Sequence, residues 1–249
     1  MRDDMSLKLI CSYAELSLAD TVLEIGPGQG SLTELLVKKV KSVVAVELDD
    51  KLAALLPNLV NADNLTVIHK NILEYDLTQL PPAYKVVANI PYYLTSRLIR
   101  VLSETANPPQ LIVLLVQKEV AERLAAAPGK MSVLAVTAQF YWQAELGEVL
   151  SRDKFSPPPK VDSQIIVLKK RNLPLFNVET EKFFRLVKLG FSARRKTLNN
   201  TLANGLRIGK AKITAVIEDL KLDANIRPQM LSMDNWFALY ELVLAENLL

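Results

Sequence analysis

The most specific chemical motif in the chain is Asn89-Ile90-Pro91-Tyr92, which follows a predicted strand and suits the binding of an aromatic amine. The N6 amine of adenine is a weak nucleophile because its lone pair is delocalised into the ring. The Asn89 side-chain oxygen and the Ile90 backbone carbonyl can each accept an amine hydrogen, which favours a pyramidal nitrogen. Pro91 stiffens the loop, and Tyr92 offers a ring on which an extruded base can stack. The motif therefore predicts methyl transfer to N6 of adenine; a strand that ends in a proline turn without a catalytic role is the alternative.

A glycine-rich turn, Gly26-Pro27-Gly28-Gln29-Gly30, lies upstream between a predicted strand and a predicted helix. Glycines let the backbone approach a ligand closely, and a helix N-terminus supplies N–H donors. A dinucleotide site would have glycines at the first, third and sixth positions of the motif, whereas here they occupy the first, third and fifth. The pattern fits the nucleoside-binding turn of S-adenosylmethionine enzymes better than a pyrophosphate site. A tight strand–helix turn without a ligand is the alternative.

Two polar residues stand at the ends of the next predicted strands. Glu47 lies 21 residues after Gly26, where a carboxylate can accept both hydroxyls of a ribose. Asn71 comes just after the third strand, and its amide could contact an adenine edge. Taken alone, Asn71 would more often be a turn residue.

Alternating strand and helix patterns position these residues. Apolar runs rich in β-branched residues predict strands, and segments with helical spacing lie between them. The predicted strands are 21–25, 42–47, 65–69, 84–89 and 110–116, and the predicted helices are 31–40, 50–59, 96–105, 118–127 and 130–141. This alternation predicts a parallel sheet with helices on both faces. Two more strands, 145–150 and 163–169, are joined by a loop too short for a helical crossover, so we expect an antiparallel edge hairpin.

The pattern becomes purely helical after Arg171. A proline-containing linker at 172–177 precedes predicted helices at 179–189, 192–203, 210–220 and 234–246. Asp234 is the expected N-cap of the last helix. We therefore predict a Rossmann-like α/β domain at 1–171 and a small all-helical domain at 172–249.

Charge is distributed unevenly between these two domains. The chain has 30 basic and 27 acidic residues, which divide into 19 and 19 up to Arg171 and 11 and 8 after it. Nine basic residues and no acid occur within 182–212. A basic stripe of this kind indicates a polyanion partner, although a solvated helical face is the simpler alternative.

Composition excludes several other classes of function. Half of the residues are hydrophobic and 23% are charged, which is typical of a folded domain. One histidine, His69, and one cysteine, Cys11, cannot make a His-rich metal site or an internal disulfide. No signal segment opens the chain, and the longest apolar run, 111–116, is too short to cross a bilayer. We expect a cytoplasmic protein without a bound metal or a membrane span.

Together these motifs resemble the small-subunit ribosomal RNA adenine dimethyltransferases of the KsgA type. The resemblance covers nearly the whole chain and includes Leu23–Gly30, Val46–Asp49, Asn89–Tyr93, Val116–Ala121, Phe155–Ser163 and Phe191–Leu198. It implies a class I methyltransferase sheet, S-adenosylmethionine as cofactor, and dimethylation of adenosine N6 in small-subunit ribosomal RNA. The implied partner is that RNA or a pre-assembled small subunit, which gives a role in ribosome assembly. We expect the enzyme to act as a monomer.

The resemblance also implies roles for particular residues. It places the cofactor at Gly26, Glu47, Asn71 and Asn89, next to the turn glycines Gly28 and Gly30, and it implies that Phe155 sandwiches the target base against Tyr92. The second domain then binds RNA, and we assign Arg194, Arg195 and Lys196 to that contact.

This sequence departs from the family pattern in two places. The family commonly has Asp where Asn71 stands, and an amide oxygen can still accept from an adenine amine, so we expect a modest loss of affinity. Members usually also carry a basic arm and a Gly-Gln-His/Asn-Phe-Leu motif that closes over the cofactor's methionine end. The printed sequence begins just beyond that point, at Met1-Arg2-Asp3-Asp4, and we expect weaker cofactor binding where the motif is lacking.

Three alternatives stay open. An adenine methyltransferase of large-subunit RNA or of DNA would use the same acceptor pair, but the Arg194-Arg195-Lys196 helix and the Pro157-Pro158-Pro159 segment favour small-subunit RNA. A non-catalytic RNA-binding assembly factor would keep the fold without turnover. A protein-glutamine methyltransferase would usually have proline where Ile90 stands.

Overall fold

The computed structural model describes residues 4–90, 94–154, 159–171, 175–193 and 195–249. The predicted site residues Pro91, Tyr92, Phe155 and Arg194 lie outside the described residues. The chain divides into two compact units, one made of 1–122 and 142–170 and the other of 123–141 and 171–249. Each unit is described by itself.

The first unit is built on a seven-stranded sheet with the order β3-β2-β1-β4-β5-β7-β6. Strands β1 to β5 are parallel, whereas β7 runs antiparallel between β5 and β6. This confirms the predicted parallel sheet with an antiparallel edge hairpin. The strands are β1 (Thr21–Ile25), β2 (Ser42–Glu47), β3 (Leu65–His69), β4 (Lys85–Asn89), β5 (Leu111–Gln117), β6 (Trp142–Leu150) and β7 (Ser163–Lys170).

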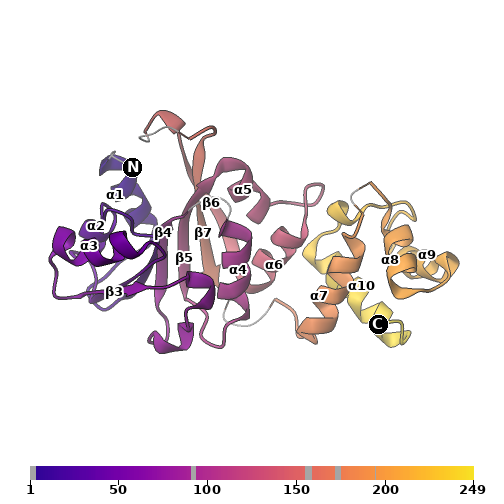
Figure 1. Cartoon of the computed structure of the whole chain (residues 1–249). Coiled ribbons are helices and arrows are strands. Elements are labelled where there is room, and N and C mark those ends of the chain that lie inside the picture. Colours follow the sequence, from indigo (N-terminus) through magenta and orange to yellow (C-terminus); the bar gives the residue numbers. More distant parts are fainter. Residues whose placement is uncertain (1–3, 91–93, 155–158, 172–174, 194) are drawn as a thin grey trace. The chain divides into compact units, whose positions relative to one another are not determined.

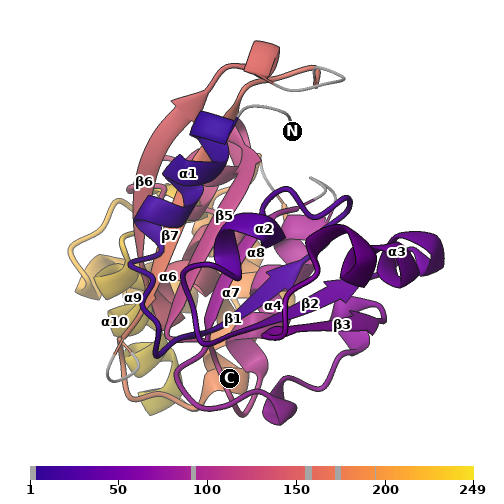
Figure 2. The same ribbon diagram turned by 90° about the vertical axis from the view of Figure 1, so that its left-hand side faces the viewer.

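Helices cover both faces of this sheet (Figures 1 and 2). One face carries α1 (Asp4–Tyr13), α2 (Thr33–Leu36) and α3 (Asp50–Val60), and the other carries α4 (Thr95–Glu104) and α5 (Lys118–Leu124). Strand β5 is apolar on both sides because it lies in the middle of these layers: Leu111 to Val116 are all at most 5% exposed. Alternate β5 residues, Val113 and Leu115, share a core with Leu7, Ile10 and Leu36 from α1 and α2.

The sequence patterns missed α1 and overestimated the length of α2. Helix α1 buries Leu7, Ile10 and Cys11, which is the spacing of one helical face, and Ala14, directly after the helix, is buried as well. The segment predicted as a helix over 31–40 is regular only from Thr33 to Leu36. Beyond it, the Asn64 side-chain amide donates to the carbonyls of Val37 and Val40, so a side chain from outside the segment satisfies two carbonyls that follow α2.

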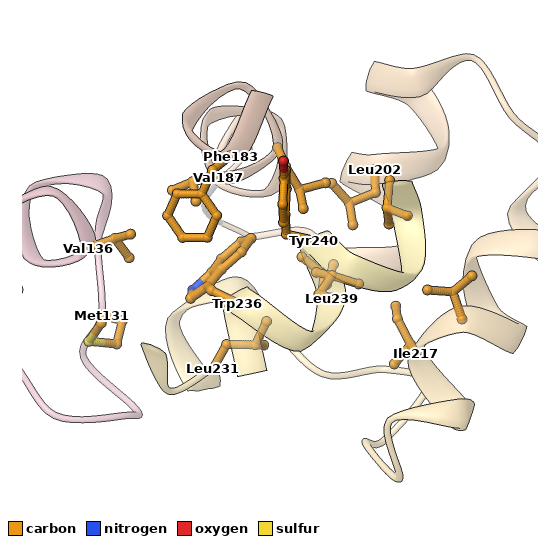
Figure 3. Close-up of a cluster of buried hydrophobic side chains, with 14 of the residues drawn as sticks. Met131, Val136, Phe183, Val187, Leu202, Ile217, Leu231, Trp236, Leu239 and Tyr240 are labelled. Carbon is orange, nitrogen blue, oxygen red and sulfur yellow. The ribbon is translucent and has the colours of Figure 1, made fainter. Parts of the chain in front are cut away.

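The second unit is all-helical and surrounds a core of aromatic and aliphatic side chains (Figure 3). Its helices are α6 (Val133–Tyr141), α7 (Thr180–Gly190), α8 (Leu198–Leu206), α9 (Lys210–Asp219) and α10 (Met233–Ala245). Helix α6, predicted to lie in the first domain, belongs here because Phe140 stacks on Phe183 with 5.3 Å between ring centroids. Val136 joins the same core as Trp236 and Tyr240.

Two helix starts in this unit differ from the prediction. Helix α10 is capped by Ser232 rather than Asp234, because Ser232 and Asn235 bond each other's backbone N–H in a capping box. Helix α8 begins at Leu198, six residues later than the predicted start at Ser192. In the described part of the chain, no helix combines the length and the apolar character that a membrane crossing needs.

Candidate active site

Four of the predicted site residues, Gly26, Glu47, Asn71 and Asn89, lie at strand ends along one edge of the first unit's sheet. The chain builds β1, β2 and β3 outward in one direction and then returns to place β4 on the other side of β1. The carboxyl ends of β1 and β4 flank this switch in strand order, where open α/β sheets bind ligands. Gly26 follows β1, Glu47 ends β2 and Asn89 ends β4, so the fold brings them to the same edge.

The glycine turn has the backbone that its sequence predicts. Gly26, Gly28 and Gly30 all have positive φ, at 66°, 58° and 85°. A Cβ on Gly30 would lie 2.7 Å from Leu56 Cδ1, so this glycine lets α3 pack against the turn. A Cβ on Gly26 or Gly28 would meet no atom of another described part of the chain within 4 Å, so among these residues both glycines face open space that a ligand can fill.

Glu47 is a buried carboxylate, 8% exposed, that is already held by the backbone. Its Oε2 accepts from the Gly28 N–H at 3.0 Å, and its Oε1 accepts from the N–H groups of Leu48 at 2.8 Å and Asp49 at 3.0 Å. A carboxylate has about four lone-pair sites, so Oε2 can still accept from a ligand hydroxyl. Glu47 thus links the glycine turn to the end of β2.

A cavity of about 690 Å³ opens beside these groups. Its lining comes from the ends of β1, β2 and β3 and from the start of α4, and comprises Ile25, Gly26, Val46, Glu47, Leu48, Asp49, Lys70, Asn71, Ile72, Leu73, Leu94 and Arg97. The structure therefore brings Gly26, Glu47 and Asn71 together as predicted. Gly28 donates its N–H to Glu47, which lines the cavity, whereas Gly30 allows Leu56 of α3 to pack against the turn.

Asn71 lies in the cavity wall as the N-cap of a short 3-10 helix, η1 (Ile72–Glu74). Its Oδ1 accepts from the Leu73 N–H at 3.1 Å, and its Nδ2 donates to Glu74 Oε1 at 3.2 Å. His69, at the end of β3, contacts the same region through a 3.1 Å hydrogen bond between its Nε2 and the Leu48 carbonyl. The Glu74 side chain thus holds the Asn71 amide, and the His69 side chain holds the loop after Glu47.

Asn89 and Ile90 end the strand on the other side of the switch. Asn89 is half-buried and pairs in register with Leu115 of β5, while Ile90 is 2% exposed. Neither residue belongs to the lining of the 690 Å³ cavity: Asn89 is the last residue of β4, the direct neighbour of β1, and Ile90 comes directly after it. The edge therefore presents a cavity of about 690 Å³ and, at the end of the neighbouring strand, the first two residues of the Asn89-Ile90-Pro91-Tyr92 sequence.

The family of the chain follows from its match to a known protein family. The family described as "Ribosomal RNA adenine dimethylase" matches residues 1–243. The chain is a member of the ribosomal RNA adenine dimethylase family. Its chemistry is accordingly that of a methyltransferase.

Similar proteins carry related names. The ribosomal RNA small subunit methyltransferase A of Dehalococcoides mccartyi is 41% identical over 247 residues, which cover 97% of this chain and 84% of that one. The protein of the same name from Rippkaea orientalis is 40% identical and covers 95% and 92%. Among solved structures, a dimethyladenosine transferase from Plasmodium falciparum matches with a TM-score of 0.82 at 24% identity, covering 99% and 98%. The 23S rRNA methyltransferase ErmE matches with a TM-score of 0.79 at 27% identity, covering 97% and 98%.

The dimethylase site contains groups that sequence motifs did not single out. Leu48 is 61% exposed although it is a large apolar residue, and it lines the cavity directly after Glu47. Two exposed cations, Lys70 and Arg97, lie at the same cavity. The sequence shows only a leucine directly after a strand-end acid; its exposure is visible in the structure alone.

Glu24, two residues before the glycine turn, is the most deeply buried acid of this dimethylase that the structure describes, at 1% exposure. Burial raises the pKa of Glu24 to about 8; the Thr33 hydroxyl opposes this shift and the negative charge of Glu47 adds to it. A carboxyl with this pKa is mostly protonated at pH 7, so the turn rests on a neutral acid.

Proposed function

We propose that this dimethylase uses S-adenosylmethionine to dimethylate N6 of adenosines in small-subunit ribosomal RNA. The observation that supports this most is the placement of Gly26, Glu47 and Asn71 around one cavity, with Asn89-Ile90 at the end of the adjoining strand. Relatives named ribosomal RNA small subunit methyltransferase A, 40–41% identical over most of the chain, support the choice of RNA. A monomeric state and a cytoplasmic location stay predictions.

The residues around the cavity fit the cofactor. The open space in front of Gly26 and Gly28 admits close approach of a ligand, and Oε2 of Glu47 can accept from a ribose hydroxyl. Asn71 offers an amide oxygen to an adenine amine, and Leu48 offers an exposed apolar surface to the base. When bound, S-adenosylmethionine supplies an activated methyl group on a sulfonium.

The chain's own part in the reaction is to orient and polarise the target amine. The Asn89 oxygen and the Ile90 carbonyl accept the two N6 hydrogens, which turns the nitrogen lone pair away from the ring. Both acceptors also stabilise the positive charge that develops on N6 as the methyl transfers. No strong general base is needed, because the N6 proton becomes acidic only after transfer. We assign stacking of the base to Tyr92 and Phe155.

The proposal is tested by offering purified protein and labelled S-adenosylmethionine to four substrates: unmethylated small subunits, naked small-subunit RNA, large-subunit RNA and DNA. We expect N6,N6-dimethyladenosine, identified by mass spectrometry, in one or both small-subunit substrates. The likeness to ErmE makes large-subunit RNA the specific alternative. Product confined to large-subunit RNA or DNA would overturn the substrate assignment, and tight RNA binding without any product would favour an assembly factor.

Glu47→Ala should weaken binding of S-adenosylmethionine by roughly 1–3 kcal/mol, as expected for lost hydrogen bonds to a charged group. The loss has two sources, because Glu47 both faces the cavity and holds the glycine turn through Gly28. Isothermal calorimetry measures the affinity. Asp50→Ala, which removes an exposed acid from the start of α3 nearby, is the control and should bind normally. Equal affinity of wild type and Glu47→Ala would remove Glu47 from the site.

We further propose that the second unit docks RNA through its basic residues. No acid occurs among the nine basic residues of 182–212 in the sequence, but two of these residues pair with acids from outside that range. Lys182 pairs with Glu179 at 2.9 Å and Lys212 with Glu246 at 3.2 Å. Six others are exposed and form no ion pair with another described residue: Arg185, Lys188, Arg195, Lys196, Arg207 and Lys210. Arg194, the ninth, is outside the described residues. The unpaired six are the better candidates for phosphate contacts.

Replacing both Arg195 and Lys196 with alanine should weaken RNA binding and flatten its dependence on salt. The slope of log affinity against log salt should fall by about 1.4–1.8, at roughly 0.7–0.9 per lost phosphate contact. The control with the same loss of charge is Lys182→Ala with Lys212→Ala, which should change the slope less because both lysines already have acidic partners. Equal slopes for wild type and the Arg195/Lys196 variant would place RNA elsewhere.

A further inference from the structure

The Asn71 amide has two chemically different ends, and the structure holds each end against a matching partner. Leu73 N–H points at Oδ1 from 3.1 Å, and Glu74 Oε1 faces Nδ2 at 3.2 Å. Rotating the amide by half a turn would place its NH₂ against an N–H donor and its oxygen against a carboxylate. Both contacts therefore favour a single orientation.

This orientation matters because Asn71 lies in the wall of the cavity. An amide oxygen has two lone pairs, of which the Leu73 N–H uses one. The other lone pair can accept from an exocyclic amine of a bound base. A base with a carbonyl at the same position would instead present an acceptor to an acceptor, which is repulsive.

We propose that Glu74 is a positioning residue that fixes the Asn71 amide and thereby makes the cavity selective for an aminopurine over an oxopurine. The inference rests on the proposed binding of an adenosyl cofactor. Glu74 is exposed and does not belong to the cavity lining, so it acts only through Asn71. Glu74 is the last residue of η1 and Asn71 is the N-cap of the same short helix, so the pair spans one short turn.

The pair is also matched in charge. A carboxylate at position 71 would stand where the amide now donates to Glu74, about one hydrogen-bond length from a second carboxylate. Two like charges at that separation repel each other. The neutral amide avoids this repulsion and gains a hydrogen bond, so Glu74 explains why an amide suits this cavity.

The test measures binding, by calorimetry, of two ligands that differ at one position: S-adenosylhomocysteine, with an amine, and S-inosylhomocysteine, with a carbonyl. Wild type should prefer the adenosyl ligand. Glu74→Ala should reduce this preference by about three- to tenfold, the usual range for one net hydrogen bond. Glu74→Lys, which presents a donor to the amide, should reduce it further. Comparing two ligands of equal charge cancels general electrostatic effects of these substitutions.

The control repeats the Glu74 substitution in an Asn71→Asp variant. A carboxylate at position 71 has two acceptor oxygens and no NH₂ group, so Glu74 has no amide orientation to fix. In that background Glu74→Ala should leave the preference unchanged and should raise adenosyl affinity by relieving repulsion. A merely structural role of Glu74 in η1 would lower affinity in both backgrounds.

The outcomes distinguish a failure of the proposed function from a failure of the role assigned to Glu74. Wild type that binds neither ligand would overturn the proposed function and this inference with it. Wild type that binds both ligands equally would show that Asn71 does not face the base. A normal preference in Glu74→Ala and Glu74→Lys, with the adenosyl ligand still preferred by wild type, would overturn the role of Glu74 and leave the proposed function standing.

Discussion

Asn89→Ala should lower kcat for methyl transfer by roughly a hundredfold, or about 3 kcal/mol, which is typical for removing one acceptor or donor that meets charge in a transition state. The reason is that the Asn89 oxygen is one of only two groups assigned to the N6 hydrogens. Its partner, the Ile90 backbone carbonyl, survives any side-chain substitution. The measurement is single-turnover methylation of small-subunit substrate at saturating cofactor.

Asn64→Ala is the matched control for this experiment. Asn64 is also a partly buried asparagine of the first unit, but its amide donates to the carbonyls of Val37 and Val40 and supports the end of α2. Its loss should lower the melting temperature and leave kcat near normal. Asn89→Ala should show the reverse. A folded Asn89→Ala variant with near-normal turnover would contradict the mechanism.

The sheet of this dimethylase could be predicted because its signals are local. Buried parallel strands are continuous apolar runs, and all seven strands were found with their ends within three residues of those observed. Signals that depend on a distant partner were missed. The α2 segment was expected to continue to Val40, but it is regular only to Leu36, and the distant Asn64 binds the carbonyls of Val37 and Val40.

The placement of the site followed from the same strand ends. Gly26, Glu47 and Asn71 each follow a parallel strand, and the carboxyl ends of parallel strands meet at one edge. How each side chain is held could not be predicted. Glu47 was expected to bind a ribose, yet three backbone N–H groups already donate to it: two come from the loop that follows β2 and one from Gly28 of the glycine turn.

The charge pattern shows a similar limit. A count along the chain finds nine basic residues without an acid over 182–212. In the folded unit Glu179 lies one turn before Lys182, and Glu246 at the end of α10 reaches Lys212. Exposed pairs of this kind contribute little stability, but they decide which cations are available to a phosphate.

Glu24 should make the stability of the folded protein fall as the pH rises from about 4.5 to about 8. The unfolded carboxyl releases its proton near its ordinary pKa of 4.5, whereas burial keeps the folded carboxyl protonated up to about 8. Between these values the folded state binds one more proton than the unfolded state, so the free energy of unfolding decreases with pH. The slope is at most about 1.4 kcal/mol per pH unit for one proton.

Glu24→Gln should remove this dependence, because glutamine has nearly the same shape and is neutral at every pH. Thermal melts at pH 5 and at pH 8.5 measure it as a difference between variant and wild type, in which all other titrating groups cancel. We expect the variant to gain melting temperature relative to wild type as the pH rises. The control is Glu34→Gln on α2, which makes the same change of side chain at an exposed acid. Parallel pH curves for wild type and Glu24→Gln would mean that Glu24 titrates alike in the folded and unfolded chains.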